Sequence, residues 1–266
     1  NVVGSLEGKV AVVTGAGVGV GRAVALTLAR EGAGVVCVGG RDTATEIRAG
    51  GGLAIFTDAD VSDMAGGERV VELAVAELGR LDILVNAASG LDRASDPKWG
   101  GGLAELSPED FYAAVRTGLK ATFTPTRHAA GVFRKQRSGR IVSITSDAGL
   151  GESNAAARAS VSEGIIGMTR TVGRDLGKYG VTANAVVADD EAGAAALIGA
   201  LCTDALANIN ARTLGTRDGS IFLYAEPDVV AGVHKWGQLT LDELDALVPR
   251  IIEPALPQAE QMEASL

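Results

Sequence analysis

Residues 10–29 read VAVVTGAGVGVGRAVALTLA, and this stretch decides the fold class. It opens with a continuously apolar run of strand length, and residues with the apolar spacing of a helix follow at 21–32. Gly15, Gly19 and Gly21 fall between the two, at a predicted turn from strand to helix. Glycine lets the backbone turn tightly there, and it lets a pyrophosphate approach the unpaired N–H groups at the start of the helix. A tight turn without a ligand is the alternative interpretation.

Short apolar runs of the same kind recur along the chain, at 35–40, 53–60, 81–87, 140–145 and 181–187. Stretches with helical spacing lie between some of them, at 68–79 and 111–123. Short, continuously apolar strands that alternate with helices are typical of a parallel sheet covered on both faces. We therefore predict an α/β fold, a Rossmann-type doubly wound parallel sheet in a single domain.

The domain organisation follows from the absence of internal linkers. No run rich in proline, serine or charge divides residues 1–225, so we predict one domain there, with its last strand at 220–227. A C-terminal tail, 226–266, follows the domain. Within it Thr240 and Glu243 have the spacing of a capping box, which predicts a short helix. We expect this tail to be helical and to pack on the domain or on a partner subunit.

The composition excludes several classes of partner. Lys and Arg total 24 against 33 Asp and Glu, so the formal charge is −9 at pH 7, which argues against nucleic acid as a ligand. No stretch reaches roughly 18 uninterrupted apolar residues, and the start of the sequence has no basic region followed by an apolar one. We expect a cytoplasmic protein that does not span a membrane.

The cysteines and histidines do not suggest a metal site. Cys37 lies in an apolar run and Cys202 in an alanine-rich segment, without a CxxC pair, so both are predicted to be buried free thiols. His128 and His234 are isolated in sequence. We expect His128 on a helix surface or at an interface, and His234 in a packing role, with a place at the mouth of a cleft as the alternative.

Five segments together resemble one known family. TGAGVGVG at 14–21 looks like the TGxxxGxG signature of the short-chain dehydrogenase/reductase family, and residues 60–61, Asp-Val, resemble its adenine-binding acidic pair. LDILVNAAS at 81–89 resembles the family's LDxLVNNAG, and GRIVSITS at 139–146 and YGVTANAV at 179–186 also match family segments. The resemblance implies the Rossmann-type fold predicted above.

The end of the chain suggests a subfamily. GSIFLYAEPDVV at 219–230 and TLDELDALVP at 240–249 resemble actinobacterial 3-hydroxyacyl-CoA dehydrogenases and 3-oxoacyl reductase-like members. An acyl-CoA-like substrate is what this second resemblance implies.

The family resemblance also implies an NAD(P) cofactor, with contacts from Thr14, Gly15, Gly19, Gly21, Arg41, Asp60, Val61 and Asn86. Asp60 is expected to accept a hydrogen bond from the adenine amino group, and a helix-capping acid is the alternative. Asn86 is expected to bridge strand ends or to touch a ribose. NADP is favoured over NAD because Arg41, which suits a 2′-phosphate, precedes Asp42 after the second strand.

The catalytic positions depart from the family pattern. The family uses a Tyr as general acid, a Lys four residues later, a Ser that polarises the carbonyl and an Asn that holds a relay water. Ser146 matches the serine. EGIIGMTR at 163–170 resembles the family's AGxIGxTR, which places Arg158 and Ser162 at the Tyr and Lys positions. Counting from Ser146 instead gives Ala159 and Glu163, so neither alignment supplies the pair, and we predict a degenerate catalytic site.

Further departures fall at the same end of the expected cleft. Gly118 in TGLKATF stands where the relay Asn belongs, and Ala188 and Asp189 replace residues of the family's VxPG. Ala87 and Ser89 replace Asn and Gly in the segment after the fourth strand. The phosphate and adenine end keeps its motifs, whereas the departures gather where nicotinamide and substrate would meet.

We therefore predict a non-catalytic or regulatory subunit that pairs with an active relative, or else forms a homodimer or homotetramer. The alternative is an NAD(P)-dependent oxidoreductase for a carbonyl or hydroxyl substrate, in which Ser146 and Arg158 stabilise an oxyanion. A lyase, isomerase or binding protein is a third hypothesis, with its base among Glu152, Glu163, Asp147 and Asp189. Arg158 and Ser162 can also be interface residues, with Arg158 bonded to Glu152 or Glu163.

Overall fold

Eight strands form one sheet, in the order β3-β2-β1-β4-β5-β6-β7-β8, within residues 4–91 and 102–256, which the computed structural model describes. The strands are β1 (Val10–Thr14), β2 (Gly34–Val38), β3 (Ala54–Thr57), β4 (Ile83–Asn86), β5 (Gly139–Thr145), β6 (Val181–Ala188), β7 (Thr213–Arg217) and β8 (Ser220–Leu223). All neighbouring pairs are parallel except β7 and β8. The order reverses between β1 and β4, and such a switch point is where doubly wound sheets bind ligands.

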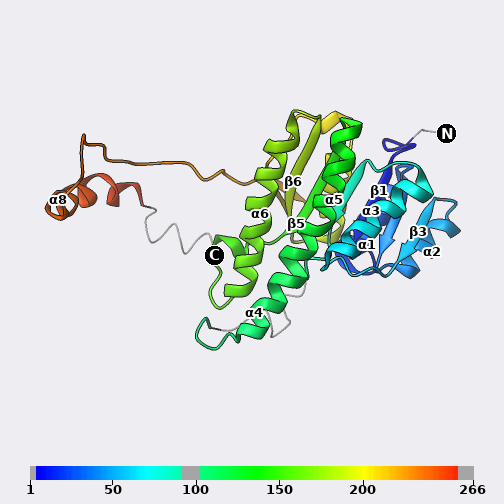
Figure 1. Ribbon diagram of the computed structural model, residues 1–266, viewed down its shortest axis with the longest axis horizontal. Coiled ribbons are helices and arrows are strands. Elements are labelled where there is room, and N and C mark those ends of the chain that lie inside the picture. The colour runs from blue at the N-terminus through cyan, green and yellow to red at the C-terminus, as the bar shows by residue number, and fades with distance from the viewer. Residues whose placement is uncertain (1–3, 92–101, 257–266) are drawn as a thin grey trace. The chain divides into compact units, whose positions relative to one another are not determined.

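Helices connect the strands (Figure 1). They are α1 (Gly19–Arg30), α2 (Arg41–Ala49), α3 (Met64–Leu78), α4 (Pro108–Ala114), α5 (Ala121–Gln136), α6 (Ala156–Gly177), α7 (Glu191–Leu201) and α8 (Leu241–Ile251). A π-helical turn, Val115–Lys120, joins α4 to α5, so three elements make one continuous helical segment. The predicted helix 111–123 therefore spans the end of α4, the π-helical turn and the start of α5.

Successive side chains of each strand point to opposite faces, and helices cover both faces. Val13 of β1 belongs to the buried cluster that α1 and α7 complete, whereas its neighbour Val12 packs in the cluster completed by α3, α5 and α6. Both valines are fully buried. The central strands are apolar on both faces for this reason, which is the pattern that the sequence analysis used to predict a covered parallel sheet.

The structure confirms the α/β class and the mostly parallel doubly wound sheet, and it corrects the far edge. The sequence analysis missed β7, TLGTR, because it holds a single large apolar residue, Leu214. The strand predicted at 220–227 is shorter, and it is antiparallel because a two-residue turn, Asp218–Gly219, joins it to β7. Both turn residues have positive φ, 48° and 74°, as tight hairpin turns require.

The chain divides into two units, residues 1–224 and 225–266. In the second unit α8 begins with the predicted capping box, in which the Thr240 hydroxyl accepts from the Glu243 N–H and the Glu243 carboxylate accepts from the Thr240 N–H. This confirms the predicted short helix. Packing of the tail on the domain or on a partner stays a prediction. No helix within the described ranges has the length and hydropathy that crossing a membrane requires.

Candidate functional site

The glycine turn between β1 and α1 is closed so tightly that side chains are excluded. Gly15 and Gly19 have φ of +65° and +54°, a region that L-residues with a side chain rarely adopt. A Cβ on Gly21 would lie closer than 3.0 Å to the Gly15 carbonyl oxygen, and one on Gly17 would lie 2.5 Å from the Gly39 carbonyl oxygen. A side chain at any of these four glycine positions would therefore strain or block the turn.

The start of α1 leaves its N–H groups open to a ligand. The N-cap residue, Val18, offers no side-chain hydrogen bond. In contrast, the side chains of Asp63 and Asp190 cap α3 and α7 by accepting from Gly66 and Gly193 N–H groups. Uncapped N–H groups and the helix dipole favour an anion, so the turn and the helix start fit the pyrophosphate of a dinucleotide.

Thr14 holds the turn against the neighbouring strand. Its side chain is fully buried, and its hydroxyl accepts from the N–H groups of Ala87 and Ala88, at 3.0 and 3.1 Å. These bonds join the carboxyl ends of β1 and β4, which flank the switch point. Thr14 is thus a positioning residue for the glycine turn, and its direct contact with a cofactor stays a prediction.

Asn86 at the end of β4 bridges strand ends, which is the first of its two predicted roles. Its side-chain amide donates to the Thr126 hydroxyl at 3.0 Å and to the Ser143 hydroxyl at 3.1 Å. The residue is 1% exposed. The amide therefore ties β4 to β5 and to α5 beneath the cleft, and a ribose contact stays a prediction.

Asp60 lies after β3 in a loop where its carboxylate is exposed. It accepts from the Ser62 N–H at 2.8 Å, and Arg116 approaches to 3.9 Å. The bonds from Ser62, with Arg116 as a smaller contribution, hold the pKa of Asp60 below its ordinary value. Asp60 does not cap α3, because Asp63 does, so the capping alternative is wrong. The Val61 carbonyl accepts from the Thr124 hydroxyl, which fixes this loop on α5.

Arg41 stands at the first position of α2, directly after the end of β2. Its guanidinium carbon lies 4.2 Å from the centroid of the Phe56 ring, so the cation stacks on an aromatic face. The residue remains exposed. This places a cation near the second strand, and preference for NADP over NAD stays a prediction.

The hydroxyl groups of Ser146, which follows β5, and Ser162 are in hydrogen-bond contact. Their hydroxyl oxygens are 2.7 Å apart, and the Ser162 carbonyl accepts from the Thr145 hydroxyl at 3.0 Å. Ser162 lies on α6 and is fully buried. The serine after β5 is therefore hydrogen-bonded to the side chain four residues beyond Arg158.

Arg158 lies one turn earlier on α6 and lines the same cavity as Ser146. Its guanidinium forms an ion pair with Glu152, one of the two acids predicted for it, whereas Glu163 pairs with Arg170 at 3.5 Å. Of the two alignments considered above, the one with Arg158 and Ser162 bonds Ser162 to Ser146 and places Arg158 in the lining of the cavity that Ser146 also lines. Glu163 of the other alignment is not among the residues that line the cavity.

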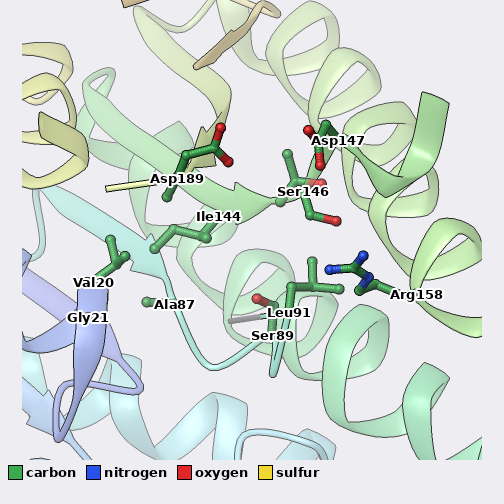
Figure 2. A pocket seen from close by; sticks show the side chains of 12 residues that line it. Val20, Gly21, Ala87, Ser89, Leu91, Ile144, Ser146, Asp147, Arg158 and Asp189 are labelled. Carbon is green, nitrogen blue, oxygen red and sulfur yellow. The ribbon is translucent and has the colours of Figure 1, made fainter. Parts of the chain in front are cut away.

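A cavity of about 330 Å³ joins these parts (Figure 2). Val20 and Gly21 of α1 line one end, and Ser146 and Arg158 line the other. Figure 2 shows Asp147 and Asp189 along one side, with Ser89 and Leu91 across from them. The cavity thus runs from the uncapped start of α1 across the carboxyl ends of β4, β5 and β6.

The position predicted for the relay Asn is filled by a neighbour. Gly118 lies in the π-helical turn, and a Cβ built there would lie closer than 3.0 Å to a methyl carbon of Val161 and 3.2 Å from the Ser89 carbonyl oxygen. Val161 is fully buried. A side chain at residue 118 therefore needs space that Val161 of α6 already occupies.

Comparison with known proteins assigns the chain to a family. The family model described as short chain dehydrogenase matches residues 9–189. The chain belongs to the short-chain dehydrogenase family. The predicted family resemblance and its Rossmann-type fold are confirmed, and the glycine turn, the cavity and Ser146 all lie within the matched residues.

Three similar proteins illustrate the relation of this short-chain dehydrogenase to others. A 3-oxoacyl-[acyl-carrier-protein] reductase of Synechocystis is 33% identical over 239 residues, 87% of this chain and 90% of that protein. The (2S)-[(R)-hydroxy(phenyl)methyl]succinyl-CoA dehydrogenase subunit BbsD of Thauera aromatica is 35% identical over 186 residues, covering 68% and 72%. A crystal structure of a short chain dehydrogenase from Mycobacterium avium superposes with a TM-score of 0.87 at 28% identity, covering 96% and 98%.

The sequence analysis missed one charged residue of this short-chain dehydrogenase, Arg217 of β7. Its guanidinium binds Asp189 at 2.7 Å and Asp147 at 3.2 Å, so one cation joins the segments that follow β5 and β6. No motif marked Arg217, because the strand that carries it was not predicted. All four carboxylates proposed as candidate bases, at 147, 152, 163 and 189, are therefore in ion pairs.

His128, Cys37 and Cys202 of this short-chain dehydrogenase lie outside the cavity lining. His128 is half-buried on α5, and His234 of the second unit makes an edge contact with Trp236, with ring centroids 5.6 Å apart. Cys37 and Cys202 are buried free thiols, as predicted, and burial raises their pKa values to about 11 and about 12. Among the described residues no group of three or more potential ligands could hold a metal ion.

Proposed function

We propose that this short-chain dehydrogenase binds NAD(P) without the family's standard acid–base machinery and acts as a non-catalytic or regulatory subunit. One observation carries the proposal: α6, which supplies Arg158 and Ser162 to the neighbourhood of Ser146, contains neither tyrosine nor lysine. The three tyrosines of the chain are Tyr112, Tyr179 and Tyr224, and none lines the cavity.

The replacements at these positions cannot perform the expected chemistry. A guanidinium does not act as a general acid in proteins, so an arginine at residue 158 cannot take the role of the family's phenol. Ser162 carries no charge that would lower a neighbouring pKa, and its hydroxyl is already bonded to Ser146. Burial raises the pKa of Tyr224, and Asp147 and Asp189 add to that shift, so this phenol is also a poorer acid than a free one.

The cofactor half of the proposal rests on the glycine turn. Gly15, Gly19 and Gly21 with the start of α1 would hold the pyrophosphate, and Asp60 and Val61 would meet the adenine. Arg41 supports NADP over NAD in this proposal, because the residue begins α2 after the end of β2 and its guanidinium lies over the Phe56 ring of β3. When bound, the cofactor would supply a nicotinamide that accepts or donates hydride.

A partner subunit is the second half of the proposal. A largely apolar cavity of about 450 Å³ opens between α5 and α6, lined among others by Phe123, Met168 and Val172. Phe123 is 44% exposed, as expected for a face that another subunit covers. The relative BbsD is named as a subunit, so a similar chain works in an assembly. We propose an active short-chain dehydrogenase as the partner, and a homodimer or homotetramer otherwise.

The test combines binding, turnover and assembly. The purified chain is titrated with NADH and NADPH while nicotinamide fluorescence and the melting temperature are recorded, because binding to the native state raises apparent stability. Carbonyl substrates, including 3-oxoacyl-CoA esters, are then supplied with the bound cofactor. We expect binding without turnover. Steady cofactor-dependent turnover by the chain alone would contradict the non-catalytic role.

Assembly is tested by co-expression with each active short-chain dehydrogenase of the same genome. Native mass spectrometry should show a complex that contains both chains. Phe123→Glu, in the groove between α5 and α6, should break that complex, whereas Tyr112→Glu on α4, at a site 69% exposed, is the control for introducing a charge on an exposed aromatic position. Exclusively self-associated chains in every co-expression would contradict the pairing.

A second function is favoured by one observation: Ser146 and Arg158 both line the cavity. In this alternative an NAD(P)-dependent oxidoreductase reduces a carbonyl, the hydroxyl and guanidinium stabilise the developing oxyanion, and water supplies the proton. An acyl-CoA-like substrate follows from the relatives' names. Loss of turnover in both Ser146→Ala and Arg158→Ala, with Arg170→Ala unaffected, would support it.

A further inference from the structure

The cavity has one side whose charge the proposed function does not use. Asp147 follows β5 and Asp189 follows β6, and both line the cavity on the same side (Figure 2). Their side chains are 44% and 34% exposed, so their charges act through water and protein together. This side is continuous with the wall that carries Ser146.

The two carboxylates share a single cation. Arg217 donates from Nε to Asp189 at 2.7 Å and from a terminal nitrogen to Asp147 at 3.2 Å. Arg217 is not itself among the lining residues, and Arg158, the cation that does line the cavity, is paired with Glu152. These five groups together carry one net negative charge. Ser162, the next side chain on this face of α6, adds none.

The sheet topology places this charge at the nicotinamide end of a bound dinucleotide. In a doubly wound sheet each half of the dinucleotide lies over one half of the sheet, and the pyrophosphate lies at the switch point. Asp60 after β3 belongs to the adenine half. The cavity begins at Gly21 beside the switch point and ends at Asp147 and Asp189, over the other half.

The two redox states of the cofactor differ in charge at this end. The oxidised nicotinamide ring carries a positive charge, and the reduced ring is neutral, whereas their adenine and phosphate parts are the same. We propose that the cleft prefers the oxidised dinucleotide, with Asp189 as the residue that determines this preference, so that the subunit responds to the redox state of the cofactor pool. The inference rests on the proposed cofactor binding and names how that site is regulated.

The size of the preference follows from one net charge in a partly exposed cleft. Such a charge changes a binding equilibrium by roughly tenfold at the effective dielectric constants found near protein surfaces. We therefore expect the oxidised cofactor to bind about tenfold more tightly than the reduced one, and the ratio to fall as salt screens the charge.

The experiment compares dissociation constants on the intact chain by isothermal titration calorimetry. The ligands are NAD⁺, NADH, NADP⁺, NADPH and ADP-ribose, which lacks the nicotinamide. Asp189→Asn keeps the shape of the side chain and removes its charge, so we expect the oxidised-to-reduced ratio to approach one in this variant. Glu77→Gln, an exposed carboxylate at the end of α3, is the control and should keep the ratio of the parent.

The outcomes separate the inference from the proposed function. Equal affinity for both redox states, or tighter binding of the reduced state, overturns the inference and leaves cofactor binding intact. An unchanged ratio in Asp189→Asn overturns the role of that carboxylate. Failure of all five ligands to bind overturns the proposed cofactor site itself, and the inference with it.

Discussion

At the scale of single residues, Val161 fills the space beside Gly118, so a substitution at residue 118 alone cannot place an asparagine there without a clash. Val161 of α6 is fully buried, and one of its methyl groups occupies the position next to Gly118. The two residues are 43 positions apart in the sequence but meet between the π-helical turn and α6. Restoring an asparagine therefore requires a change on both helices.

Gly118→Asn is expected to lower the free energy of unfolding by about 1–3 kcal/mol, because the new side chain overpacks a buried site. Such a loss corresponds to a fall in melting temperature of about 2–4 °C per kcal/mol for a chain of this size. Thermal and urea unfolding measure both quantities.

The matched control is Gly131→Asn on α5, where a Cβ meets no atom within 4 Å. This variant should keep the stability of the parent or gain slightly, since asparagine has a better helix propensity than glycine. The double variant with Val161→Ala, which removes the opposing methyl groups, should recover part of the loss. Equal stability of Gly118→Asn and Gly131→Asn would contradict the steric argument.

The charge on Asp60 makes a pH-dependent contribution to stability. Its pKa is lowered in the folded chain, chiefly by hydrogen bonds from Ser62. A carboxylate of this kind stabilises the fold at pH values above its ordinary pKa of about 3.9, and the contribution is lost as the pH falls through the lower folded value. Asp60→Asn should therefore reduce stability at pH 6 and make less difference at pH 2.5.

Urea unfolding at the two pH values measures this difference, and Asp58→Asn in the same loop gives the background effect of removing a carboxylate. A deficit of Asp60→Asn that is as large at pH 2.5 as at pH 6 would show that the lost interaction does not involve the charge.

At the scale of elements, the sequence predicted those whose pattern is local. The apolar runs of β1, β2, β4, β5 and β6 were found because both faces of these strands are covered. The capping box of α8 was found because its two residues are three positions apart. β7 was not predicted because it holds a single large apolar residue, Leu214, and its place in the sheet depends on pairing with β6 and β8. Arg217 was missed with it.

The capping box offers a test of α8 as an element. Thr240→Ala removes the side chain that accepts from the Glu243 N–H, and it also removes a contact that holds Glu243 in place. N-cap replacements of this kind cost about 1 kcal/mol. Because no residue of α8 is buried, we expect the loss to speed amide hydrogen exchange throughout Leu241–Ile251 by about fivefold.

Thr171→Ala on α6 is the control, since its hydroxyl is exposed and bonds to a carbonyl of its own helix. It should leave exchange in α8 unchanged. Unaltered protection of α8 in Thr240→Ala would mean that interactions other than the cap hold this helix.

At the scale of the whole molecule, the candidate site is an assembly of distant segments, which limits what the sequence alone can tell. The glycine turn could be predicted because its residues are contiguous. The contact of Ser146 with Ser162, and of Asp147 and Asp189 with Arg217, could not, since each joins elements whose positions depend on the sheet order. Family motifs supplied the positions of Arg158 and Ser162, and the fold showed that Ser162 bonds to Ser146 and that Arg158 lines the same cavity.

The reactivity of the two buried thiols measures unfolding of the first unit. Cys37 of β2 and Cys202 after α7 lie in the same buried cluster, and burial raises both thiol pKa values to about 11 and about 12. Both thiols therefore stay protonated at pH 8, and we expect a thiol reagent to label neither in the native chain. Both should react in denaturant, and Val229→Cys, at a site 84% exposed, is the control for rapid labelling. Rapid labelling of the parent would contradict this burial.

The first unit is expected to fold without the second. Among the residues that the structure describes, the three buried apolar clusters lie within residues 1–224, and their last buried member is Leu214, so a chain that ends at Tyr224 keeps its core. We expect it to unfold cooperatively, with a melting temperature within about 2 °C of the parent, because a loss of 1 kcal/mol would already exceed this margin. Differential scanning calorimetry checks this, and light scattering gives the mass of the assembly. An unchanged melting temperature with fewer subunits in the assembly would place the tail on a partner subunit. A large fall in melting temperature at an unchanged number of subunits would contradict the expectation, since the tail would then be part of the fold of its own domain.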